Sequence, residues 1–396
     1  MKALIMAVAI ALMLLLPLPA AAVAATTTDT AAETQVTTEG VADSTDTEAI
    51  DEYLQQLDGT MNEYLDEFSF SDWWEQMLSG DISFDVTMIT DLFISLFFSE
   101  AAANTALIGQ LVVLAVICLL LSAIKDSFEK SDISMLSRAV VYLVLTGIAL
   151  SSFSLVLNSS KEAITSMSDF LYAVLPVLMP LLAAMGGVST VAIVNPLILT
   201  ALSLMVDLIN NFIFPLIYFS AILRLLGQIS PRFNIDKLAR LFRDIALGVM
   251  GVMTAVFIAL IGILGVGTAS FDGLTVKAAK SATGIFIPVV GRSLADAIDS
   301  VLGTALQLKN IVGIAGVLVL LVICALPAVQ ILVQAIIYRL AAALIQPLGE
   351  DQLAEAINGM GSSLIAIFAV TAICGLFFFF ILAVVIGSGN ITMMMR

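Results

Sequence analysis

Polar side chains that could do chemistry stand inside long apolar runs of this sequence. Asp207 interrupts an apolar run of 33 residues from Val191 to Leu223, and Arg339 lies in a second long run. An ionisable group at the bilayer centre costs about 2.5–3.5 kcal/mol on insertion scales, so such groups usually face a protein interior or a wet cavity. The alternative is that they cap broken helices or reach toward the membrane surface. The candidates for lining a pathway, with Asp207 and Arg339 as a candidate pair, are Asp207, Asn210, Asn211, Gln334 and Arg339.

A second candidate is the charged segment TVKAAKSATGIFIPVVGRSLADA, residues 275–297, which lies between apolar runs. Apolar residues recur at helical spacing on both sides of IFIPVV, which predicts two amphipathic helices separated by a breaker that begins at Gly284. Irregular backbone at membrane depth is tolerated only inside protein or against a water-filled cavity. Two interpretations of residues 272–310 stay open, a re-entrant hairpin with IFIPVV at its tip and two helices lying on the outer surface. Its candidate residues are Lys280, Pro288, Gly291 and Arg292.

The sequence lacks the residues and motifs of the common enzyme classes. Histidine is absent, which removes the usual neutral-pH base and the commonest metal ligand. The three cysteines sit singly inside apolar runs, and neither a phosphate-binding G-x-x-x-x-G-K-[ST] loop nor a G-x-S-x-G motif occurs. We therefore expect no catalytic residues, no metal and no cofactor.

Composition identifies an integral membrane protein. Hydrophobic residues make up 60% of the chain and charged residues 12%, against about 45–50% and about 25% in soluble domains. The net charge of −16 comes from one region, since 18 acidic residues lie between Thr26 and Asn104. No basic patch supports nucleic-acid binding. The expected fold is all-α, a polytopic helical membrane protein with a small, acidic, helical N-terminal ectodomain.

The N-terminal quarter is expected to lie outside the cytoplasm. Residues 1–25 have a positive start, an apolar stretch and small residues at Ala22 and Ala24, as in a cleaved secretory signal peptide. Residues 26–49 are typical of an acidic disordered linker. Residues 50–104 show apolar positions at helical spacing opposite an acidic face, which predicts an amphipathic helical ectodomain. It would lie on the membrane, serve as a docking surface, or both.

Residues 105–390 are expected to form a multi-pass membrane domain, followed by a short tail at 391–396. A span needs about 20 apolar residues, or about 30 Å of helix. The run at 191–223 is too long for one crossing and is interpreted as two spans or two half-helices, while 311–348 is interpreted as one broken helix or a hairpin. The predicted total is seven to nine crossings with broken helices, at 105–124, 139–157, 171–187, 191–223, 245–269, 311–348 and 362–387.

Charge fixes the expected orientation. The densest basic cluster follows residue 223, and the positive-inside rule places it in the cytoplasm. Two spans at 191–223 satisfy that rule, and the segment 275–297 then lies outside. Glycines in the later spans, such as Gly248 with Gly251 and Gly313 with Gly316, are expected to allow tight helix packing or self-association. The basic residues of the cluster are Arg224, Arg232, Lys237, Arg240 and Arg243.

The long motifs of the C-terminal half resemble one family. They are DGLTVKAAKSATGIFIPVVGRSLADAIDSVLG, LKNIVGIAGVLVLL, IYRLAAALIQPLG and the terminal GNITMMMR. Together with the order of signal peptide, acidic ectodomain and basic loop, they resemble stage III sporulation protein AE. The resemblance covers nearly the whole mature chain, and the linker is its least family-like part.

The resemblance implies a role in endospore-forming bacteria. It implies a membrane subunit of a channel or secretion complex between mother cell and forespore, in the mother-cell membrane around the forespore. The implied partners are the other stage III sporulation AA to AH proteins, including a separate ATPase and ring-forming subunits, and stage II sporulation protein Q. The missing ATP-binding motif agrees with a separate ATPase.

Three functions remain open from the sequence. The leading hypothesis is a non-enzymatic channel or export-complex subunit. Broken helices with polar residues also occur in self-sufficient secondary transporters, which would show two halves with corresponding interrupted spans. The third is an assembly scaffold without a pore. The lipid bilayer is an expected partner under all three, and homo-oligomerisation stays open.

Overall fold

The structure is a computed structural model that describes most of the membrane domain. It describes residues 86–107, 132–185, 188–229, 235–286, 291–348 and 351–394, with a few single positions between 109 and 120. Within these ranges every regular element is a helix and none is a strand. The predicted signal peptide, linker and most of the ectodomain lie outside the described residues and stay predictions, as does most of the span at 105–124.

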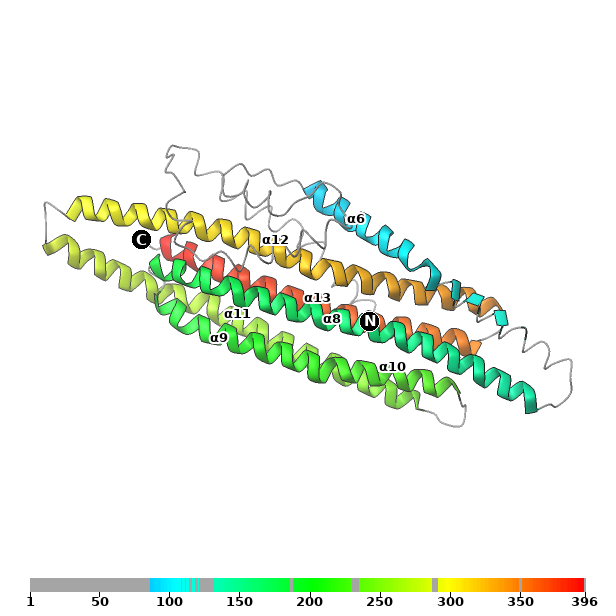
Figure 1. Cartoon of the computed structure of the whole chain (residues 1–396). Helices are drawn as coiled ribbons and strands as arrows, with labels where there is room; N and C mark the ends of the chain where they lie inside the picture. Colours follow the sequence, from blue (N-terminus) through cyan, green and yellow to red (C-terminus); the bar gives the residue numbers. More distant parts are fainter. Residues whose placement is uncertain are drawn as a thin grey trace.

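Five long helical rods lie roughly alongside one another (Figure 1). They are α8, the continuous α9–η1–α10, α11, α12 and α13, and consecutive rods run in opposite directions because the connections between them are short. We call the basic end the one where α8 begins and where α10–α11 and α12–α13 connect. The hairpin end carries the α8–α9 and α11–α12 connections (Figure 1). The elements are α6 (Val86–Ala103), α8 (Asp132–Ala184), α9 (Val188–Leu208), the π-helical η1 (Ile209–Ile213), α10 (Phe214–Ile229), α11 (Asp236–Phe286), α12 (Gly291–Ile345), the short η2 (Gln346–Leu348) and α13 (Asp351–Met394).

Helix α13 forms the centre of the bundle. It packs against α8, α10, α11 and α12, and its apolar side chains are buried around most of its circumference. A helix that is hydrophobic all round belongs in the interior of a bundle. Helix α6 packs on α12, and Leu96 of α6 joins the same apolar core. The predicted boundary between ectodomain and membrane domain at Asn104 stays a prediction.

Glycine permits the closest helix contact in the molecule, between α12 and α13. A Cβ added to Gly313 would lie 2.5 Å from Ile386, and one added to Gly375 would collide with Sγ of Cys324. The prediction that Gly313 and Gly316 allow close packing is therefore confirmed. For Gly248 and Gly251 packing within the chain is not found, because no atom of a neighbouring helix lies within 4 Å of an added Cβ, and their use in self-association stays a prediction. Both glycines are on the exposed side of α11.

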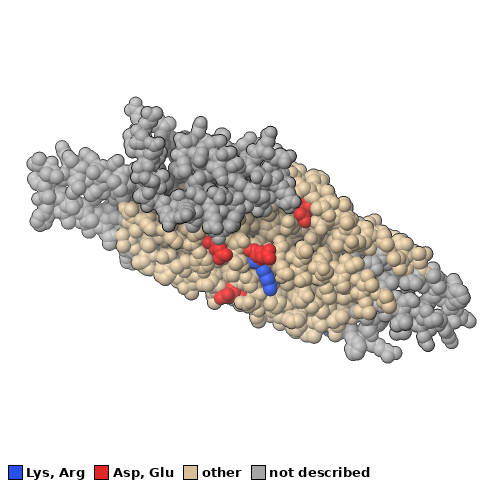
Figure 2. Space-filling model, viewed as in Figure 1, with Lys and Arg blue, Asp and Glu red and all other residues tan. Residues whose placement is uncertain are grey.

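The described residues contain five helices long and apolar enough to cross a membrane. The face of the described part in Figure 2 carries very few charged side chains, as a lipid-facing surface requires. The predicted all-helical membrane fold is confirmed, but the predicted count of seven to nine crossings is not. The five candidate spans are Thr146–Ala184, Val191–Gly227, Asp236–Gly262, Val312–Ile345 and Asp351–Gly387.

The prediction of separate spans at 139–157 and 171–187 is wrong, because α8 continues through the polar stretch between them. Ser160 is buried, and its hydroxyl donates to the Val156 carbonyl at 2.8 Å within the same helix. Glu162 and Lys161 are exposed or half-buried. The stretch therefore needs no loop, since its buried hydroxyl is satisfied inside the helix.

The division of 191–223 into two spans is also wrong. α9, η1 and α10 follow one another without a gap, so the chain does not turn back there. The irregularity expected near Asp207 to Asn211 is present as the π-helical turn η1, Ile209–Ile213. A single extra residue in a π-turn changes the helix phase without ending the helix.

The run at 311–348 is likewise neither broken nor a hairpin before Ile345. α12 passes through Pro327, which is buried, without interruption. The proline removes one backbone donor, but it does not end the helix here. The predicted hairpin within this run is therefore wrong.

Both interpretations of the segment 272–310 stay predictions. α11 runs unbroken through Gly284 to Phe286, and α12 starts at Gly291, so the two helices form a hairpin (Figure 1). The order helix, breaker, helix holds, with the four breaker residues 287–290 outside the described residues. From the end of the apolar run at residue 269, 17 further residues of α11 extend about 25 Å at about 1.5 Å each.

Candidate functional site

A polar seam joins α8 and α12 inside the bundle. Ser152 Oγ lies 3.4 Å from Oε1 of Gln334, and Ser159 Oγ lies 3.5 Å from Oε1 of Gln330. Gln334 is buried, 7% exposed. Such bonds between membrane helices average about 0.6 kcal/mol, because polar groups find partners in the membrane-unfolded state too. The candidate Gln334 is thus a helix-joining residue.

Tyr338 extends the polar seam by one further turn of α12. Gln330, Gln334 and Tyr338 are four residues apart and share one face. The side chain of Tyr338 is fully buried, and its hydroxyl interacts with the Ser152 side chain of α8. The sequence analysis missed Tyr338, although its spacing from the two glutamines was a usable signal.

The predicted pair of Asp207 and Arg339 is not formed. Both side chains are exposed, and no described ion pair joins them. Arg339 lies along α13, where a Cβ added to Gly361 would be 3.0 Å from Cγ of Arg339. α9, which carries Asp207, packs against α8 and α11. Asp207 therefore lies on the outer side of the bundle.

The two asparagines of the π-turn differ in surroundings. Asn211 is exposed, whereas Asn210 is half-buried. Its Oδ1 is buried and has no hydrogen-bond partner among the described residues. π-turns recur at functional sites in helices. Asn210 therefore remains the candidate of this group with an unexplained polar atom.

The candidates of the charged segment lie at the hairpin end. Lys280 lies in α11, and Gly291 and Arg292 begin α12. Pro288 lies outside the described residues. The structure thus separates these residues from the polar seam by the length of the helices that continue into the hairpin (Figure 1).

Lys309 was also missed by the sequence analysis. It is fully buried in α12, and its Nζ donates to the carbonyl of Ile386 in α13 at 2.5 Å. A buried lysine needs a partner, and the backbone carbonyl of Ile386 supplies one. Lys309 therefore ties α12 to α13 toward the hairpin end.

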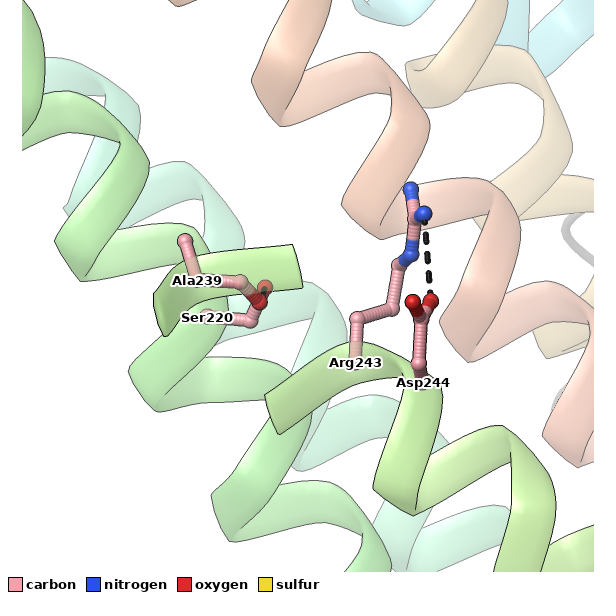
Figure 3. Close-up of polar contacts among 4 residues, drawn as sticks. All are labelled: Ser220, Ala239, Arg243 and Asp244. Atoms are coloured by element: carbon pink, nitrogen blue, oxygen red, sulfur yellow. Dashed lines mark hydrogen bonds and ion pairs between the residues drawn. The ribbon is translucent and has the colours of Figure 1, made fainter. Parts of the chain in front are cut away.

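Arginines gather at the basic end, in what we call the arginine pocket. It is a cavity of about 210 Å³ between α10, α11 and α13. Ser220 fixes the position of α11, because its buried hydroxyl donates to the Ala239 carbonyl at 2.6 Å (Figure 3). The residues that line the pocket are Arg224, Asp236, Arg240, Arg243, Glu355 and Gly359.

The arginine pocket carries more positive than negative charge. Three arginines face two carboxylates, and the one ion pair among the described residues lies beside them. In that pair Nη2 of Arg243 is 3.3 Å from Oδ1 of Asp244 (Figure 3). Nε of Arg243 is buried without a partner. The sequence analysis used these arginines only to orient the chain and did not predict a pocket.

The described residues form five helices of membrane-spanning length, one of which is the buried central helix, and none of their side-chain groups could hold a metal ion. These features define a polytopic helical membrane protein. The family model described as stage III sporulation protein AE matches residues 68–389. A protein named stage III sporulation protein AE from Bacillus subtilis (strain 168) is 40% identical over 321 residues, covering 81% of this chain and 80% of its own. The chain therefore belongs to the stage III sporulation protein AE family, as the resemblance predicted. No solved structure matches it.

Proposed function

We propose that this chain is a non-enzymatic membrane subunit of the channel or secretion complex between mother cell and forespore. Membership of a sporulation family over residues 68–389 carries this proposal, since the match spans all five long helical rods almost completely. The proposed partners are the other stage III sporulation AA to AH proteins, with a separate ATPase and ring subunits, and stage II sporulation protein Q. The chain works in the mother-cell membrane around the forespore.

The proposed orientation follows the charges. The basic end, with Arg224, Lys237, Arg240 and Arg243, faces the mother-cell cytoplasm under the positive-inside rule. The hairpin end then faces outward, toward the forespore. With a cleaved signal peptide and an outer N-terminus, residues 105–124 supply one crossing before α8, which makes six in all.

The packing of the bundle bears on how a channel could form. The space around α13 is filled by apolar side chains such as Leu364, Ile367 and Phe378. A pore lined by this subunit therefore needs a surface shared with other subunits. The same packing favours a second candidate, an assembly scaffold without a pore.

The transporter hypothesis has lost its main support. It needed corresponding interruptions in the two long runs, and the structure has the π-turn at Ile209–Ile213 but a continuous α12. Inverted-repeat transporters place broken helices in both halves.

Affinity purification of the tagged chain from sporulating cells in mild detergent tests the proposal. We expect the other stage III sporulation proteins, including the ATPase, to co-purify, and the purified chain alone to give no solute flux in vesicles. A matched control is the same purification from vegetative cells that express the tagged chain. Recovery of the chain without sporulation proteins, together with solute flux by the chain alone, would refute the subunit assignment.

A further inference from the structure

The arginines of the arginine pocket are not explained by helix packing alone. Its three arginines come from two helices, Arg224 from α10 and both Arg240 and Arg243 from α11. Neither Arg224 nor Arg240 has a carboxylate oxygen within 4.0 Å among the described residues. Arginine recognises planar or tetrahedral oxyanions through its fork of N–H donors. The pocket therefore presents two arginines, Arg224 and Arg240, that have no carboxylate partner among the described residues.

Burial of an arginine N–H donor that has no hydrogen-bond partner lowers the stability of the fold. The side chain of Arg243 is only 16% exposed, and its Nε is a buried donor without a partner. Arg243 projects from α11 toward α13 (Figure 3). An unsatisfied buried donor of a charged group is destabilising, and an anion in the pocket would satisfy it.

The shape of the pocket leaves room for an anion. Its volume of about 210 Å³ corresponds to about seven waters at about 30 Å³ each. Gly359 of α13 forms part of the wall, and an added Cβ there would touch Cδ of Arg224 at 3.5 Å. A phosphate group with its four oxygens fits this space beside the guanidinium groups.

The position of the pocket indicates the source of the anion. Arg224 lies in the last turn of the candidate span Val191–Gly227, and Asp236 begins the next span. Glu355 lies in the second turn of α13, so three helices end or begin around the pocket. Ends of membrane spans lie at the depth of lipid headgroups, and basic pockets between such helices on the cytoplasmic side bind anionic headgroups.

We propose that the arginine pocket binds a phosphate group, supplied by the headgroup of an anionic lipid. Arg224 and Arg243 hold the phosphate oxygens, and Arg240 adds positive charge at the exposed rim. Asp236 and Glu355 also line the pocket, and their negative charge opposes the binding of a phosphate. This proposal does not depend on the proposed function in sporulation.

The test uses the purified full-length chain and measures lipid retention by native mass spectrometry. Phosphatidylglycerol should be retained in preference to phosphatidylcholine. Hydrogen bonds to charged groups are worth about 1.5–3 kcal/mol, so Arg224→Gln or Arg243→Gln should weaken retention roughly 10- to 100-fold. Glu355→Gln removes a negative charge from the pocket and should strengthen it.

Lys237→Gln is the matched control, because Lys237 is exposed, lies about one turn from Arg240 on the same helix, and does not line the pocket. It removes the same charge and should leave retention unchanged. Equal losses in Lys237→Gln and Arg243→Gln, or equal retention of the two lipids by the unmodified chain, would overturn the site. Because Glu355→Gln is expected to gain affinity, misfolding cannot imitate its result.

Inorganic phosphate separates the two sources of the group. With phosphatidylglycerol bound in detergent, millimolar phosphate should displace the lipid only weakly. If phosphate alone raises the melting temperature, if Arg243→Gln abolishes that rise, and if lipid retention is the same in all variants, the site is an anion site for free phosphate and the lipid assignment fails.

Discussion

At the residue scale, the contact between Gly375 and Cys324 allows a direct test of how closely α12 and α13 pack. Gly375→Ala should destabilise the protein by about 1–3 kcal/mol, because the new methyl group would collide with Sγ of Cys324. Cys324→Ala should recover part of the loss. Thermal unfolding in detergent measures both effects.

Gly248→Ala serves as the control for that substitution. Nothing lies within 4 Å of an added Cβ at Gly248, so stability should not fall, and alanine is the better helix former. If Gly375→Ala and Gly248→Ala behave alike, the close approach of α12 and α13 at Gly375 is wrong.

The polar seam gives a second prediction at this scale. Gln334 is buried and bonds Ser152 across helices, so Gln334→Leu should cost less than about 1 kcal/mol. Cells carrying it should still form heat-resistant spores. Spore counts and the level of the variant protein are the two measurements. Loss of spores at a normal protein level would show that Gln334 acts in a pathway after all.

Some candidate residues could be ranked from sequence and others could not. The pattern found Gln334 and the irregular helix near Asn210, because polar atoms in apolar runs are visible directly. It did not find the arginine pocket, since the arginines at 240 and 243 become neighbours of Glu355 only when α13 packs against α11. The expected pair of Asp207 and Arg339 failed for the same reason. Sequence shows that a charge needs a partner but not which helices meet.

At the element scale, the α11–α12 hairpin is the main departure from expectation. Amphipathic spacing correctly predicted two helices around a breaker, but it carries no information on whether a helix bends where it leaves the membrane. Gly284 was expected to break the first helix, and α11 passes through it. Helix direction depends on the neighbouring elements as well as on the local sequence.

Impermeant maleimide labelling tests the extended hairpin. Cysteines placed at Lys280 and Arg292, in a chain whose Cys118, Cys324 and Cys374 are replaced by alanine, should be labelled from the outer side. A cysteine at Leu364, in the buried centre of α13, is the control and should react slowly. Protection of both hairpin positions from the reagent would contradict a hairpin that extends past the membrane.

At the scale of the whole molecule, the orientation derived from sequence stays a prediction, and the misjudged spans do not change it. The runs 139–157 and 171–187 merge into α8, and the run 191–223 stays single. Four expected crossings therefore become two. Because an even number was lost, the basic cluster and the 275–297 segment still lie at opposite ends of the bundle (Figure 1). The number of crossings could not be counted correctly from the apolar runs, because the helices are much longer than the membrane thickness of about 30 Å.

The central claim is that this bundle works within a multiprotein complex that it meets at both ends. Site-specific photo-crosslinking in sporulating cells tests it most directly, with the probe at Arg292 on the hairpin end or at Lys237 on the basic end. We predict adducts of Arg292 with sporulation proteins that have domains outside the cytoplasm, and adducts of Lys237 with cytoplasmic ones, the ATPase among them. An absence of protein adducts from both positions, with the chain present at its normal level, would contradict the account.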